Sequence, residues 1–157
     1  MRIDDEAQIA VVKLDPLWFD ENAWKVYLPA GRYRLSLATR RIENLGLAPA
    51  ASTALLEAGT HHLVLEQHLR GDAWQVVVTA DGKTLCVARE SKDWNPGYGS
   101  TGGGEYSLSG QSPRDQPVVM FRRRFHQSDG QRGSTTPPGP TEGILLWIGP
   151  AEFPTGP

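Results

Sequence analysis

Three consecutive arginines, Arg122-Arg123-Arg124, are the residues whose type and spacing most directly suggest chemistry in this chain. They continue an apolar run, and side chains alternate between the two faces of a strand. Arg122 and Arg124 would therefore share one face. Paired guanidinium groups fit carboxylate and phosphate oxygens, so they predict a binding site for an anion or an acidic sugar. An edge strand guarded by charge, or ion pairs with Asp115 and Glu142, would explain the same residues.

A second group of candidate residues is aromatic and lies in a glycine-rich segment, residues 90–116, which contains Trp94, Tyr98 and Tyr106. A connection longer than about 12–15 residues is usually functional or disordered. Large rings must pack on something or be offered to a ligand. Two interpretations follow. The rings could stack on sugars, or Trp94 could anchor the segment to the domain, leaving Gly102–Gly104 as its most mobile part.

The histidines offer a weaker possibility of metal binding. On a strand, Glu66 and His68 would share a face and could approach one metal ion, with His62 or His126 as a third ligand. A half-exposed polar strand face explains these residues more simply. The single cysteine, Cys86, excludes an intramolecular disulfide and a multi-cysteine metal site. We therefore predict no metal site.

No sequence motif for nucleophilic or cofactor-dependent catalysis is present, and we predict no catalytic residues and no cofactor. Pairs of Asp and Glu side chains form in space rather than in sequence, however. A hydrolase that uses two carboxylates therefore stays open as an alternative.

A pattern that occurs twice indicates how such residues are positioned. Residues 28–37 (LPAGRYRLSL) are echoed by residues 56–65 (LEAGTHHLVL). In each copy an Ala-Gly pair precedes alternating apolar and polar residues, which is typical of a strand leaving a tight turn. The pattern predicts a hairpin at Ala30-Gly31 and a second turn at Ala58-Gly59. Residues 49–58 also fit a short helix that Gly59 would terminate.

Further strands are predicted on both sides of Asp81-Gly82, a strong hairpin signal, and at residues 7–14, 117–125 and 143–148. The last run is apolar on both faces and should lie centrally in a sheet. About eight strands without a long amphipathic helix predict one all-β domain, residues 1–157. We expect an antiparallel β-sandwich, with a jelly roll as one arrangement that fits. Its long loops would be residues 90–116 and 126–142.

The first copy of the pattern, Pro29-Ala30-Gly31-Arg32-Tyr33-Arg34-Leu35, resembles hairpins of carboxypeptidase-regulatory-like and related carbohydrate-binding-like β-sandwich modules of bacterial surface proteins. In the second copy His61 takes the tyrosine position and Glu57 the proline position. The resemblance implies an accessory, non-catalytic module. It carries no site residues to this chain.

Composition limits the partners. A formal net charge of -2 and a pI near 6.1 give no electrostatic reason to expect binding to nucleic acid. No apolar run reaches the roughly 18–20 residues that span a bilayer, so we expect no membrane insertion by this chain. Its acidic N-terminus lacks the apolar region of a signal peptide, although a signal or anchor removed earlier would leave no trace.

These observations lead to three functional hypotheses. The first is a non-enzymatic interaction or structural module of a bacterial extracytoplasmic assembly, with a protein partner; a cytoplasmic location is the alternative. The second is a carbohydrate-binding module that holds a polysaccharide with loop aromatics. The third is the carboxylate-dependent hydrolase.

Overall fold

The described residues form nine strands, and every pair among these strands is antiparallel. The computed structural model describes residues 1–14, 21–95, 100–103, 109–126 and 138–152. In these ranges it contains no helix, which confirms the all-β prediction. The strands are β1 (Gln8–Leu14), β2 (Glu21–Ala38), β3 (Ser52–Arg70), β4 (Ala73–Ala80), β5 (Lys83–Ser91), β6 (Ser100–Gly103), β7 (Ser109–Pro113), β8 (Val118–Phe125) and β9 (Gly143–Pro150).

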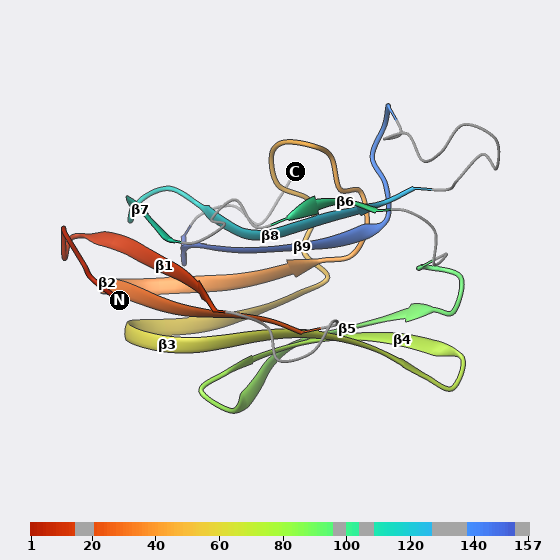
Figure 1. Cartoon of the computed structure of the whole chain (residues 1–157), viewed down its shortest axis with the longest axis horizontal. Coiled ribbons are helices and arrows are strands. Elements are labelled where there is room, and N and C mark those ends of the chain that lie inside the picture. The colour runs from red at the N-terminus through yellow and green to blue at the C-terminus, as the bar shows by residue number, and fades with distance from the viewer. Residues whose placement is uncertain (15–20, 96–99, 104–108, 127–137, 153–157) are drawn as a thin grey trace.

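Two long strands, β2 and β3, organise the fold (Figure 1). They pair along nearly their whole lengths, from Glu21 opposite Glu66 to Leu37 opposite Ser52. On its other side β2 pairs first with β1 and then, beyond its midpoint, with β9. The strand thus belongs to two layers. One continues through β3, β4 and β5, and the other through β9, β8 and β6.

The two Ala-Gly pairs do not form hairpin turns, and this part of the prediction is wrong. Both lie inside β2 and β3, where the ladder shifts register between Leu28 and Arg32. Gly31 has a φ of 146° and Gly59 a φ of 133°, a region that side chains other than glycine rarely adopt. These angles bend each strand without reversing it. Because Ser52 already begins β3, the strand interpretation of residues 49–58 holds and the helix does not.

One main apolar core lies between the layers and makes the molecule a β-sandwich. Trp24 on β2 and Phe121 on β8 meet edge to face with ring centroids 6.2 Å apart. β9 is central, as predicted, and all but its last residue is buried. The residues with no exposed surface in this core are Ile9, Trp24, Val26, Leu35, Leu37, Leu63, Val76, Val78, Cys86, Met120, Leu146 and Ile148.

The connections differ from expectation in one place. The segment predicted as a long loop, residues 90–116, includes the short strands β6 and β7, and Gly102 and Gly103 are part of β6.

The β4–β5 hairpin forms as predicted, since Asp81 (φ 52°) and Gly82 (φ 81°) both have the positive angles of a two-residue turn. Within the described ranges the structure contains no helix of the length and apolarity needed to span a membrane.

Candidate functional site

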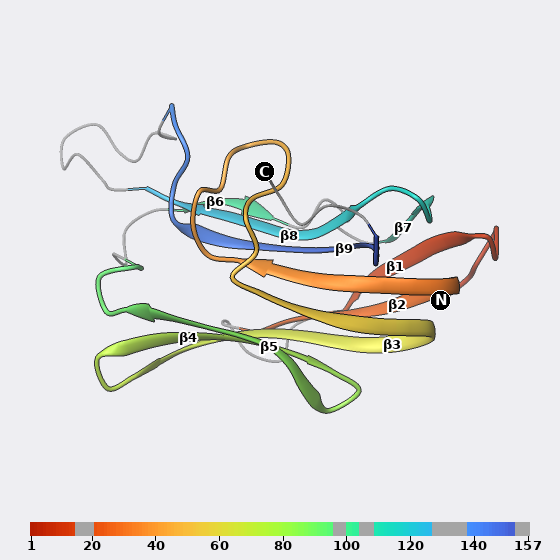
Figure 2. The same cartoon turned by 180° about the vertical axis from the view of Figure 1, so that it is seen from behind.

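The loop between β2 and β3, residues 39–51, is held over the outer face of β8 and β9 by two of the three arginines (Figure 2). Arg122 donates hydrogen bonds to the carbonyl oxygens of Glu43 and Gly46, both at 2.8 Å. Only 7% of the surface of Arg122 is exposed to solvent. A guanidinium group that is removed from water needs hydrogen-bond acceptors for its N–H groups. These two carbonyl oxygens accept from both terminal nitrogens of Arg122. Arg122 thus fixes the tip of the loop.

Arg124 fixes the adjacent part of the same loop. It is 3% exposed and donates to the carbonyl of Ile42 at 3.1 Å and to Asn44 Oδ1 at 2.6 Å. It also donates to the carbonyl of Gly139. The predicted shared face of the two arginines is therefore observed, but it contacts this loop. The edge-strand explanation is wrong, because β8 lies between β9 and β6.

An apolar cluster under the loop adds to this attachment. Ile42 and Ala48 of the loop are buried against Val119 on β8 and Trp147 on β9. The tip remains outside, and Leu45 is 82% exposed. The structure thus presents a large apolar side chain on a loop whose backbone is bonded on both sides of it.

Trp94, a predicted stacking residue, is buried inside the molecule with 3% of its surface exposed. Its ring lies 4.9 Å from the Phe125 ring and 6.2 Å from that of Trp74, both edge to face. Its indole N–H donates to the carbonyl of Thr39 at 2.9 Å. Trp94 is thus an anchor, and no face of its ring is open to a sugar. Tyr98 and Tyr106 lie outside the described residues.

A groove of about 330 Å³ lies at the base of the loop and is lined by Thr39, Arg40, Arg41, Pro49, Ala51 and Glu90. The carboxylate of Glu90 accepts a 2.6 Å hydrogen bond from the Thr39 hydroxyl. Arg40 donates to both of its oxygens, the shortest bond being 2.6 Å from Nη2. Arg41 adopts a φ of 58°, which is unusual for a residue with a side chain. This volume is near the lower limit for small-ligand pockets.

The two glutamates near Arg40 have opposite pKa shifts. Burial raises the pKa of Glu142, an effect that Arg40 partly offsets and Glu90 reinforces. Burial would also raise the pKa of Glu90, but hydrogen bonds from Arg40 and Thr39 outweigh it and lower that pKa. Environments that separate two carboxyl groups in this way can assign one as an acid. The sequence did not indicate that these two glutamates form a pair, because only the fold brings them together.

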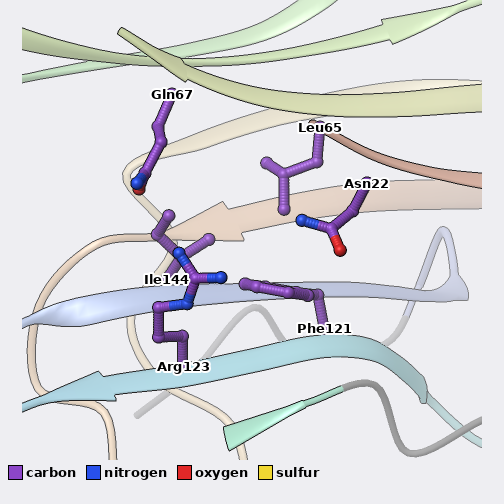
Figure 3. Close-up of a pocket in the computed structure, with 6 residues that line it drawn as sticks. All are labelled: Asn22, Leu65, Gln67, Phe121, Arg123 and Ile144. Carbon is purple, nitrogen blue, oxygen red and sulfur yellow. The ribbon is translucent and has the colours of Figure 1, made fainter. Parts of the chain in front are cut away.

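Arg123 points away from the loop and toward a small cavity between the layers (Figure 3). The cavity is lined by Asn22, Leu65, Gln67, Phe121, Arg123 and Ile144. The guanidinium carbon lies 5.1 Å from the centre of the Phe121 ring. The free volume of the cavity is about 10 Å³, which is close to the minimum that holds one water molecule. Among the residues that the structure describes, Gln67 Oε1 is buried without a hydrogen-bond partner.

The predicted polar strand face is present on β3, where His68 Nε2 lies 3.6 Å from Glu66 Oε2 and both side chains are partly exposed. His126 is buried at the end of β8, outside this group. No cluster of three metal-ligating side chains occurs among the residues that the structure describes. Cys86 is buried, and burial raises the pKa of its thiol.

Comparison of the chain with protein-family models, with curated proteins and with solved structures gives no match. The site is therefore interpreted from its own geometry. Sequence analysis missed Leu45 and the groove residues Thr39 and Glu90. The Leu45-Gly46 pair carries a weak signal, an apolar residue beside a turn-forming glycine.

Proposed function

We propose that this protein is a non-enzymatic interaction module that binds a protein partner through the loop at residues 39–51. The observation that carries the proposal is the combination of an exposed Leu45 with a backbone bonded to two buried arginines. A loop that is already ordered loses little conformational entropy on binding. An apolar side chain on such a loop can fill a pocket on a partner and contribute much of the affinity.

The groove beside the loop supports the same proposal. Pro49 and Ala51 give it apolar walls, and Arg40 gives it an exposed charge at the rim. Protein interfaces commonly combine an apolar centre with a polar rim. The groove and Leu45 lie on the same loop, so one partner segment could contact both.

A polysaccharide partner is less well supported, because Trp94 is used inside the molecule. A panel of soluble polysaccharides, titrated while tryptophan fluorescence is followed, separates the two partners. The interaction-module proposal predicts no saturable change. A saturable change that Tyr98→Ala or Tyr106→Ala abolishes would favour the carbohydrate-binding alternative.

The pKa contrast between Glu90 and Glu142 favours the hydrolase as a second candidate. In that case Glu142 would be the proton donor, and the glutamate bonded to Thr39 and Arg40 would stay ionised. The existing hydrogen bonds of Glu90 instead suit a structural role. Reducing-sugar release from the same panel tests the candidate. Activity that is lost in Glu142→Gln would establish it.

An extracytoplasmic bacterial location is also part of the proposal. Its support is the sequence resemblance of residues 29–35, which form a kink within β2, to segments of accessory modules of surface proteins. Sequencing the gene upstream of Met1 and fractionating the producing cells would test it. A signal peptide or anchor is the expected result, and protein confined to the cytoplasm would contradict the proposal.

The partner proposal is tested by placing a photoactivatable crosslinking residue at position 45 in the producing cell. We expect an adduct of defined mass. Position 69 is the matched control, because Leu69 is also exposed (53%) but lies near the β3–β4 turn, away from the loop. The adduct should be absent there.

A second variant tests whether loop order matters. Arg122→Met removes the bonds to Glu43 and Gly46 while keeping an apolar stem. We expect at least a several-fold loss of the adduct at position 45 in a protein that still gives a β-sheet circular dichroism spectrum. Equal adducts at positions 45 and 69, or no effect of Arg122→Met, would contradict the proposal.

A further inference from the structure

His61 connects the second Ala-Gly kink to the β4–β5 turn. Its Nδ1 lies 2.8 Å from Asp81 Oδ2, and its Nε2 lies 2.9 Å from the carbonyl oxygen of Glu57. The side chain is 16% exposed, whereas that of Asp81 is 52% exposed. One imidazole ring thus joins two parts of the chain that are 24 residues apart, from Glu57 to Asp81.

Both partners of the ring are hydrogen-bond acceptors. A carbonyl oxygen carries no proton, and an ionised carboxylate carries none either. A neutral imidazole has one N–H group and can serve only one of them. The observed geometry is satisfied in full only when both ring nitrogens carry hydrogen. Loss of one proton would place a nitrogen lone pair against an acceptor.

Asp81 is held in place by the backbone as well. Its Oδ1 accepts a 2.8 Å hydrogen bond from the N–H of His62, and its own N–H donates to the carbonyl of His62 at 2.9 Å. The carboxylate is therefore fixed opposite the ring whether or not the ring is charged. Only the bonds of His61 depend on its proton.

We propose that His61 is a protonation-dependent latch, which adds to the backbone bonds between the β4–β5 turn and β3 through both ring nitrogens when its ring is charged and through only one when the ring is neutral. Histidine is the side chain that most readily gains and loses a proton in the neutral pH range, so a latch built on its ring responds to pH. It is independent of the partner-binding loop proposed above.

The charges around the latch set its acid limit. The backbone N–H of His62 lowers the pKa of Asp81, and the hydrogen bond with His61 lowers it further. A depressed carboxyl pKa contributes stability that is present above the unfolded value and is lost as the pH falls through the folded one. The latch should thus be strongest between that acid limit and the pH at which the ring loses its proton.

The other titratable groups on the elements around His61 are few in the described part of the chain. Its register partner on β2 is Val26, with Lys25 and Tyr27 on either side. On β3 they are Glu57 and His62, and after the turn Lys83 begins β5. Of these, His62 is also a histidine and its backbone N–H is bonded to Asp81, so the experiment must separate it from His61.

Amide hydrogen exchange in the β4–β5 turn, corrected for the pH dependence of intrinsic exchange, tests the latch from pH 5 to pH 8. We expect the exchange rate of the Asp81 amide in the wild type to rise about tenfold across this range. His61→Gln should show fast exchange at every pH, because a neutral amide cannot replace both charge and geometry. His62→Gln and His68→Gln should keep the wild-type profile. The His68–Glu66 pair is the matched control, since it is a longer contact on the same strand.

Nitrogen-15 shifts of the imidazole rings in the wild type give a second readout that needs no variant. At pH 5.5 both nitrogens of His61 should carry hydrogen, and at pH 8 one should not. A neutral ring at pH 5.5, or parallel exchange profiles for wild type and His61→Gln, would overturn the proposal.

Discussion

The two copies of the Ala-Gly pattern have the same backbone but different rings. Gly31 and Gly59 lie at equivalent kinks, and the two kinks meet in one ladder, with Leu28 opposite Gly59. The leucines that follow are buried in both copies. In the first copy Tyr33 is 2% exposed, and its hydroxyl oxygen and nearest ring carbons lie 3.5–3.6 Å from where a Cβ of residue 31 would be. In the second, His61 bonds to Asp81 and to a carbonyl.

The comparison separates two requirements that the pattern combines. The glycine sets the bend of the strand, which both copies need. The ring two residues later makes contacts back across the bend, by apolar packing in one copy and by hydrogen bonds in the other. The packing of a tyrosine ring does not depend on pH below the range in which a phenol ionises. The hydrogen bonds of a charged imidazole ring do depend on pH.

Removing the rings should give the largest difference between the copies. Tyr33→Ala deletes a buried aromatic side chain and should lower the free energy of unfolding by about 3–5 kcal/mol. His61→Ala at pH 6 removes two hydrogen bonds from a partly exposed ring and should cost about 1–2 kcal/mol. Urea denaturation of both variants measures the values. A cost for His61→Ala equal to that for Tyr33→Ala would show that packing dominates in both copies.

Placing a Cβ at each kink tests the shared requirement. Gly31→Ala and Gly59→Ala should each cost about 1–3 kcal/mol of unfolding free energy, because alanine is strained at these φ angles. The two costs should be similar, because a Cβ at Gly31 would lie at an ordinary contact distance of 3.5–3.6 Å from Tyr33 and nothing lies within 4 Å of the Cβ position at Gly59. Gly139→Ala is a suitable control, because nothing lies within 4 Å of its Cβ position and no positive φ is involved. An unchanged stability of both kink variants would contradict the strain argument.

Sequence reasoning reached the all-β class, the β4–β5 hairpin and the central place of β9, because each depends on local alternation or on a two-residue turn. It mistook the kinks for turns. A glycine of positive φ fits a hairpin and a bulge equally well, and only the pairing of β2 with β3 across both kinks decides between them.

The candidate site was harder to predict for a different reason. Alternation placed Arg122 and Arg124 on one face correctly, but it gave no information on what would cover that face. The covering loop comes from about 80 residues earlier in the chain, as its contact with Arg124 shows. Likewise Glu90 meets Thr39 only because β5 returns to the end of β2. Such pairings depend on tertiary contacts that local patterns do not contain.

The smallest expected effect concerns the hydroxyl group of Tyr33 and gives the counterpart of the His61 experiment at high pH. Burial raises the pKa of this phenol, an effect that Arg114 partly offsets. A folded pKa above the unfolded value contributes stability that is fully present below about pH 10 and is lost as the pH rises toward the folded value. Tyr33→Phe keeps the packing and removes the titration. Its unfolding midpoint in urea should therefore match that of the wild type at pH 8 and exceed it at pH 10.5. Tyr27→Phe is the comparison variant: Tyr27 is on the same strand, its hydroxyl donates to the carbonyl of Glu6 at 3.2 Å, and its charge is a further cause of the raised pKa of Tyr33, so this variant should narrow the difference at pH 10.5 without abolishing it. If wild type and Tyr33→Phe lose stability in parallel above pH 10, ionisation of Tyr33 does not contribute to the loss. The proposed contrast, in which Tyr33 responds to alkaline pH and His61 to neutral pH, would then be wrong.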